Sequence, residues 1–121
     1  MSKANLSLRF LIELGAIVTF GIYGSSLSDS GFRFVPAILF PLLLAVIWGV
    51  FAVKDDPSRS GKTVIRTPGI IRLLLELLIF VSATGMLFHL GYPILGWTLG
   101  SATVFHYTIS FKRISWLIKQ K

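Results

Sequence analysis

Two arginine–glutamate pairs stand near the start of two apolar runs. Arg9 precedes Glu13 by four positions, and Arg72 precedes Glu76 by the same spacing. Because residues i and i+4 share one face of a helix, each pair can form an ion pair or point two charges in one direction. Ionisable groups inside a membrane cost about 2.5 to 3.5 kcal/mol each, so they face inward and find partners. We predict either cross-pairing, Arg9 with Glu76 and Arg72 with Glu13, or pairing within each helix.

Two later segments carry polar side chains at a matching depth. Trp48 lies six residues before Lys54, and His106 lies six residues before Lys112. We therefore predict one polar layer to which four helices contribute, with His106 bonded to a carboxylate. The candidate residues for this layer, and for ligand binding in it, are Arg9, Glu13, Trp48, Arg72, Glu76, His106 and Tyr107.

The purpose of such a layer has two interpretations. A buried charged layer can serve only to fix which helices become neighbours. Alternatively, two carboxylates and an imidazole can relay protons or hold a cation, which would make the layer a functional pocket. One histidine with two carboxylates that are already paired to arginines is not a recognisable metal-ligand set, so we predict no metal site. The residue types identify no cofactor.

The composition predicts an all-α membrane protein. The 121 residues are 54% hydrophobic with a mean hydropathy of +0.78, above the usage of soluble domains. Each of four apolar runs is close to the length of about 20 residues that crosses a hydrocarbon core. They cover residues 6–27, 34–53, 69–90 and 93–111. We predict one domain, a four-helix transmembrane bundle built from two parallel-repeat helical hairpins, with a loop at 54–68 and an amphipathic tail at 112–121.

The basic residues predict the orientation of the chain. Eleven of the twelve flank the termini or the loop 54–68, and only Arg33 lies in the first outer loop. By the positive-inside rule, both termini and the loop are cytoplasmic in a multi-pass protein of the bacterial cytoplasmic, or inner, membrane. The same residues would contact anionic lipid headgroups. Because they flank spans instead of forming one soluble basic face, we predict no nucleic-acid partner. The absence of cysteine leaves the redox compartment undetermined.

Several segments together carry a family resemblance in their order and spacing. They are Leu8 to Leu14, Trp48 to Phe51, Asp56 to Lys62, Arg72 to Leu77, His106 to Ser110, and Arg113 with Trp116 and Leu117. With these segments the chain resembles the YrdB-like family of small bacterial membrane proteins. The resemblance implies a four-span architecture and no established activity.

The predicted function is non-enzymatic binding of a small ligand or a partner membrane protein, including a second copy of the chain, through the polar layer. No nucleophile elbow, phosphate loop or catalytic triad signature is present in the sequence, so catalysis is disfavoured. The alternative is a proton-coupled exporter. The length, the four spans and the first-span Glu13 are similar to those of the small multidrug resistance exporters. The strong charge bias and the preceding Arg9 argue against that alternative.

Overall fold

The chain is mostly helical. The structure is a computed structural model that describes residues 2–59 and 62–121. Its helices are α1 (Lys3–Ser26), the short 3-10 helix η1 (Gly31–Arg33), α2 (Phe34–Val50), α3 (Gly69–His89), α4 (Pro93–Ile109) and α5 (Phe111–Lys119). Two very short strands complete it, β1 (Phe51–Ala52) and β2 (Ile65–Arg66).

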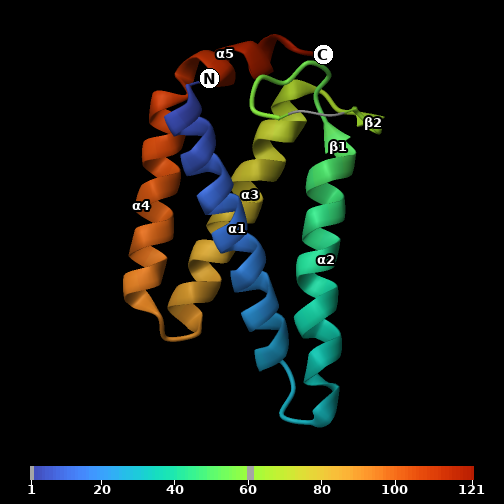
Figure 1. Ribbon diagram of the computed structural model, residues 1–121, viewed down its shortest axis with the longest axis vertical. Coiled ribbons are helices and arrows are strands. Elements are labelled where there is room, and N and C mark those ends of the chain that lie inside the picture. The colour runs from blue at the N-terminus through green and yellow to red at the C-terminus, as the bar shows by residue number, and fades with distance from the viewer. Residues whose placement is uncertain (1, 60–61) are drawn as a thin grey trace.

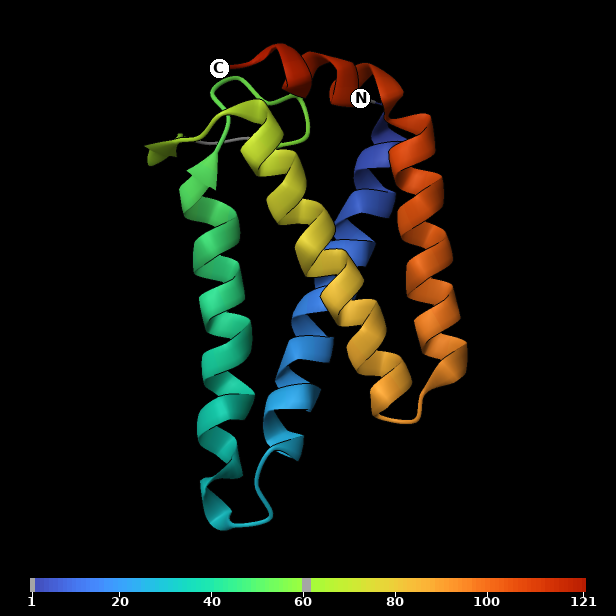
Figure 2. The ribbon, with the colours of Figure 1, turned by 180° about the vertical axis from the view of Figure 1, so that it is seen from behind.

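The four long helices run up and down side by side. α1 and α2 form one antiparallel hairpin and α3 and α4 form another, so both termini lie at the same end (Figure 1). α1 is central, because it contacts α2, α3 and α4. Seen from behind, α5 lies across the end that carries the termini (Figure 2). The buried apolar core between them includes Ile12, Ala16, Leu44, Ile79, Phe80, Ala83, Leu87 and Leu99.

Local chemistry explains where these helices begin and turn. The Ser2 side chain caps α1 by accepting a hydrogen bond from the Asn5 backbone nitrogen at 3.1 Å. Pro93 occupies the first turn of α4, where its missing N–H has no helical partner to lose. Gly91, with φ of +86°, makes the tight turn between α3 and α4 in a conformation that favours glycine.

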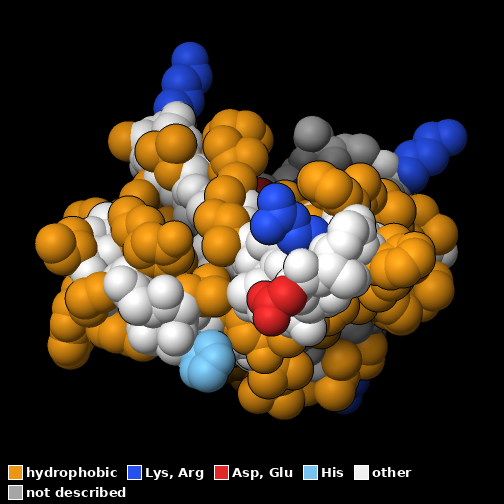
Figure 3. All heavy atoms as spheres, turned by 90° about the horizontal axis from the view of Figure 1, so that it is seen from below, with side chains coloured by type: hydrophobic (Ala, Val, Ile, Leu, Met, Phe, Trp, Pro, Cys, Tyr) orange, Lys and Arg blue, Asp and Glu red, His pale blue; other side chains and the backbone are white. Residues whose placement is uncertain are grey.

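The membrane-facing character follows from the outer surfaces of the helices. Lys3–Ser26, Gly31–Val50 and Gly69–His89 are long and apolar enough to cross a membrane. Large apolar side chains point outward, as at Ile94 and Trp97, which are 79% and 69% exposed. Figure 3 looks at the end opposite the termini, and hydrophobic side chains cover most of that face. Apolar surfaces outside and charged groups inside are what a bilayer requires of a membrane protein.

The structure differs from the prediction at the boundaries of two runs, both at the end of the molecule that carries the termini. The apolar run 93–111 is not one helix: α4 ends at Ile109, and the chain turns at Ser110 before α5 begins. The predicted loop 54–68 is partly ordered, because β1 and β2 pair in parallel and the Thr67 nitrogen donates to the Ala52 carbonyl at 2.8 Å. Its residues 60 and 61 lie outside the described residues.

Candidate functional site

One carboxylate, that of Glu76, accepts hydrogen bonds from side chains of four helices. Glu76 is fully buried. Arg9 donates to its two oxygens at 3.2 and 2.9 Å, and Arg113 donates to the same two oxygens at 2.9 and 2.8 Å. Arg72 Nε donates to Oε2 at 2.8 Å, and the Tyr107 hydroxyl donates to Oε1 at 2.7 Å. Both oxygens of Glu76 are therefore saturated by partners from α1, α3, α4 and α5.

Two further carboxylates complete what we call the ion cluster, which consists of Arg9, Glu13, Asp56, Arg72, Glu76 and Arg113. Asp56 accepts hydrogen bonds from Arg113 Nε at 2.8 Å and Nη2 at 2.6 Å. Glu13 Oε1 lies 2.9 Å from Arg9 Nε as an ion pair without an aligned hydrogen bond. Three arginines thus face three carboxylates, and the cluster is electrically balanced. This balance is what allows so many charges to be buried together.

The pairs Arg9–Glu13 and Arg72–Glu76 bring the cluster between α1 and α3. Trp48 packs against one side of the cluster. The indole ring centroid of Trp48 lies 4.6 Å from the guanidinium carbon of Arg72 and 5.3 Å from that of Arg9. Arg72 Nη1 also donates to the Trp48 carbonyl at 2.8 Å. Because α2 ends two residues later, this carbonyl lacks a helical partner, and Arg72 supplies one.

His106 is fully buried, and within the described ranges its ring nitrogens meet Asn5 and Arg9 instead of a carboxylate, so the prediction of a bond to a carboxylate is wrong. Its Nδ1 lies 2.6 Å from Asn5 Oδ1, and Asn5 Nδ2 donates to Ser110 Oγ at 2.8 Å. This places the imidazole proton on Nδ1, so that Nε2, 3.5 Å from Arg9 Nη1, is left as an acceptor. The physical reason is competition: the arginines and Tyr107 already occupy both oxygens of Glu76.

The pairing pattern combines the two predicted arrangements. Both within-helix pairs form, and so does the cross-pair of Arg9 with Glu76. Among the ion pairs of residues 2–59 and 62–121, Arg72 and Glu13 are not partners. The two glutamates also differ in burial, because the side chain of Glu13 is 25% exposed while that of Glu76 is fully buried. Glu13 is therefore the acid at the rim of the cluster.

The structure adds residues that the sequence analysis did not assign to the polar layer. They are Asn5, Asp56, Ser110 and Arg113. No helical spacing could mark Arg113, because α4 ends at Ile109 and the chain turns at Ser110 before α5 begins. No signal marked Asp56 either, which lies in the loop after β1. Among the described residues, no group of three or more His, Asp or Glu side chains is placed to hold a metal ion.

A cleft opens beside the rim of the ion cluster. We call it the α1/α2 cleft; its volume is about 520 Å³ and its lining is Leu6, Arg9, Phe10, Glu13, Trp48, Gly49, Pro57, Ser58, Arg59 and Arg72. An apolar cavity of about 140 Å³ shares Glu13, Trp48 and Gly49 with it. Arg59 Nη1 is buried and has no hydrogen-bond partner in the part of the chain that the structure describes. The cleft thus combines a partly exposed carboxylate, an unsatisfied guanidinium nitrogen and an aromatic wall.

Comparison with known proteins settles the family. The family described as "Protein of unknown function (DUF2568)" matches residues 7–104. The chain is also 38% identical over 120 residues to "Uncharacterized protein YrdB" of Bacillus subtilis (strain 168). The aligned stretch covers 99% of this chain and 98% of that protein. The chain belongs to the DUF2568 family. The resemblance to YrdB-like proteins is confirmed, and no solved structure matches this DUF2568 chain.

In this DUF2568 chain, the contact between Asp56 and Arg113 should make stability depend on acidity. Burial alone would raise the pKa of Asp56, but the hydrogen bonds and charge of Arg113 outweigh burial and lower this pKa below its ordinary value of 3.8. The folded state therefore releases this proton more readily than the unfolded state. The resulting stability is fully present above about pH 5 and declines as the pH falls through the ordinary aspartate range.

We expect Asp56→Asn to lower the free energy of unfolding by about 2 kcal/mol at pH 7. The difference in melting temperature between wild type and variant should shrink as the pH falls below about 4. Thermal melts of the detergent-purified proteins across this pH range measure it, with the exposed neighbour in Asp55→Asn as the matched control. A difference that stays constant with pH would show that Asp56 is not ionised in this contact.

Proposed function

We propose that the chain is a four-span protein of the bacterial cytoplasmic membrane, with both termini and the loop 54–68 in the cytoplasm. Besides the three long apolar helices, α4 returns beside α3 to the end that carries both termini (Figure 1). The 17 residues of α4 extend about 26 Å at the rise of an α-helix, close to the thickness of a hydrocarbon core. Eleven of the twelve basic residues lie toward the same end, which the positive-inside rule assigns to the cytoplasm.

In this orientation the ion cluster lies near the cytoplasmic boundary and joins the helices there. It ties α1, α3, α5 and the loop residue Asp56 to one carboxylate. Because Glu76 has no free acceptor, the centre of the cluster is architectural. Any ligand must therefore meet the polar layer at its accessible rim, where Glu13 lies.

The function that the geometry supports best is binding of a small amphiphilic ligand in the α1/α2 cleft. One observation carries this proposal: Glu13 and Arg59 line the same cleft beside Trp48, and Arg59 Nη1 has no partner among the described residues. A polar head group can donate to Glu13 and accept from Arg59, while apolar atoms pack on Trp48 and extend into the adjoining apolar cavity. In the other form of this proposal, the occupant of the α1/α2 cleft is a side chain. A partner membrane protein or a second copy of the chain would supply that side chain.

Native mass spectrometry of the detergent-purified protein tests the binding. We expect wild type to retain a small-molecule adduct that falls about tenfold in Glu13→Gln, the loss for removing about 1.4 kcal/mol of binding. The variant should fold, because Arg9 keeps both of its bonds to Glu76. Asp29→Asn, which neutralises an acid outside the ion cluster, is the matched control and should keep the adduct. If Glu13→Gln and Trp48→Ala retained as much adduct as wild type, the assignment to this cleft would be contradicted. A wild-type protein that carries no adduct would contradict the assignment as well.

Proton-coupled export is the second candidate, and the partial exposure of Glu13 is the observation that favours it. The contact of Arg9 with this carboxylate at 2.9 Å opposes it, because a neighbouring guanidinium stabilises the charged form that a proton carrier must give up. Cells that overproduce wild type or Glu13→Gln, challenged with a toxic organic cation, distinguish the two. Binding predicts equal survival, and export predicts resistance that the variant loses.

A further inference from the structure

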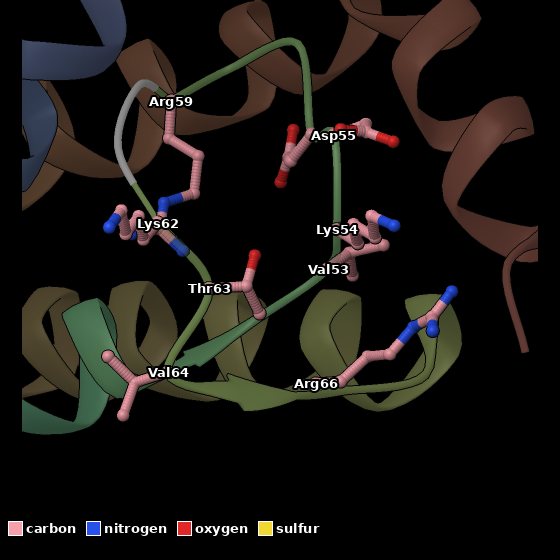
Figure 4. A pocket seen from close by; sticks show the side chains of 9 residues that line it. Val53, Lys54, Asp55, Arg59, Lys62, Thr63, Val64 and Arg66 are labelled. Carbon is pink, nitrogen blue, oxygen red and sulfur yellow. The ribbon is translucent and has the colours of Figure 1, made fainter.

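A second hollow, separate from the α1/α2 cleft in most of its lining, lies in the segment between β1 and β2. Its volume is about 750 Å³. We call it the cationic cup; it is lined by Val53, Lys54, Asp55, Asp56, Arg59, Lys62, Thr63, Val64 and Arg66. In the view of Figure 4, Arg59 and Lys62 lie along one side of the hollow, Lys54 and Arg66 lie along the other, and Thr63 stands between them.

The positive charge of the cup exceeds the negative charge in its lining. Among residues 2–59 and 62–121, none of its four basic side chains takes part in an ion pair. Asp56 is committed to Arg113 and to the Ser58 backbone nitrogen, which donates to Oδ1 at 2.9 Å. Only Asp55 remains to offset the four cations. Like charges gathered without counter-ions repel each other, so an anion in the cup would relieve that repulsion.

The framework of the cup is held by backbone contacts on two sides. β1 pairs with β2 in parallel, which brings the residues after Ala52 beside those before Ile65. The Asp56 nitrogen donates to the Val53 carbonyl, and the Arg59 nitrogen donates to the Asp56 carbonyl, each at 3.3 Å. The Asp56 contact with Arg113 then ties this turn to α5. Arg59 and Arg66 therefore project from backbone that these contacts position.

We propose that the cationic cup binds the phosphate group of a phosphorylated ligand. Ammonium groups supply point charges and guanidinium groups supply paired donors, the combination that proteins use for phosphate, and the Thr63 hydroxyl adds a neutral donor. In the proposed orientation the cup lies just beyond the cytoplasmic end of α2, at the level of lipid headgroups. An anionic phospholipid headgroup and a soluble phosphate compound offer the same chemistry. The proposal does not depend on the α1/α2 cleft, because Lys54, Lys62 and Arg66 do not line that cleft.

The test uses the full-length protein in neutral detergent, with phosphatidylglycerol and inorganic pyrophosphate as separate probes and phosphatidylcholine as the uncharged comparison. The cup variant is Lys62→Gln/Arg66→Gln. The matched control is Lys112→Gln/Lys119→Gln, which removes two exposed charges on α5. We expect the cup variant to lose about tenfold in affinity for one of the two anionic probes, which corresponds to about 1.4 kcal/mol, while the control loses much less.

Each outcome decides the proposal. Loss confined to phosphatidylglycerol identifies a lipid headgroup, and loss for pyrophosphate identifies a soluble ligand. An equal loss of affinity in the cup variant and the control would show only a general attraction between basic and acidic groups, and it would overturn the proposal. Failure of wild type to bind either anionic probe would overturn it too. If the double variant has a lower melting temperature than wild type, the test is repeated with Lys54→Gln, which changes one exposed side chain. Glu13→Gln should leave phosphate binding unchanged, which separates this result from the fate of the cleft proposal.

Discussion

Replacing Glu76 by glutamine should cause the largest loss of stability among single changes in the ion cluster. Glutamine keeps the size of the side chain but removes the negative charge that three buried arginines share. Removing one partner of a buried charge pair costs about 3 to 5 kcal/mol, because the remaining charge stays buried without compensation. Here Arg9 and Arg72 would lose their central partner together. Thermal melts in detergent, together with the yield of folded protein, measure the effect.

The matched control for this prediction is Asp29→Asn. It removes one negative charge from an exposed position between η1 and α1, outside the ion cluster, so its melting temperature should stay close to that of wild type. If Glu76→Gln melted together with this control, the convergence of arginines on one carboxylate would not be holding the helices together.

Substituting alanine for Gly69 should displace α5. A Cβ atom at Gly69 would lie 1.6 Å from the Leu117 carbonyl oxygen and 2.4 Å from its carbon, which no side-chain movement can relieve. The Gly69 nitrogen also donates to the Gln120 carbonyl at 3.0 Å, so α3 and α5 meet through their backbones. Moving α5 would withdraw Arg113 from Glu76. We expect a loss of about 3 to 5 kcal/mol, as for a broken buried charge pair.

Hydrogen exchange of the backbone amides measures this displacement directly. In Gly69→Ala the amides of α5 should lose protection while those in the middle of α1 keep theirs. Gly85→Ala is the matched control in the same helix, because apart from its chain neighbours and the adjoining backbone of α3, no atom of the described residues lies within 4 Å of its Cβ position. That change should instead stabilise α3 slightly, since alanine is favoured over glycine in a helix by about 1 kcal/mol. Unchanged protection of α5 in Gly69→Ala would contradict the close backbone packing.

The helices were predictable from the sequence because apolar runs of membrane length leave few alternatives. The bend at Ser110 was not. Ile109 and Phe111 continue the apolar run on both sides of it, so hydropathy alone extends the helix. What ends α4 is tertiary, since Ser110 Oγ receives a hydrogen bond from Asn5, which lies 105 residues earlier. The pairing of β1 with β2 could not be predicted either, because a strand of two residues is too short to show an alternation of apolar and polar side chains.

The candidate site was predictable in its centre and not at its edge. The i, i+4 spacing indicated the pairs Arg9–Glu13 and Arg72–Glu76, and both form. Arg113 was missed because a basic residue just beyond a predicted span is usually a headgroup contact. Its true role depends on the turn at Ser110, which no local pattern announced. The structure also distinguishes the two glutamates, since Glu13 is partly exposed and Glu76 is fully buried, and the internal repeat stays a prediction.

The architecture explains why the accessible part of the site is small. Six charged groups form a balanced cluster whose central carboxylate is saturated, so most of the polar layer is committed to holding helices together. In the two binding proposals, contact with a ligand falls to Glu13 and Arg59 at the α1/α2 cleft and to the basic side chains of the cationic cup.

The location of the two termini tests the central claim most directly, namely that the ion cluster closes the cytoplasmic end of a four-span protein. Separate fusions of a fluorescent protein that folds only in the cytoplasm, and of alkaline phosphatase that is active only outside it, report the side of each terminus. The account predicts fluorescence and no phosphatase activity at both ends. Phosphatase activity at either terminus would place α5 and the ion cluster on the wrong side, or give the chain an odd number of spans, and would contradict it.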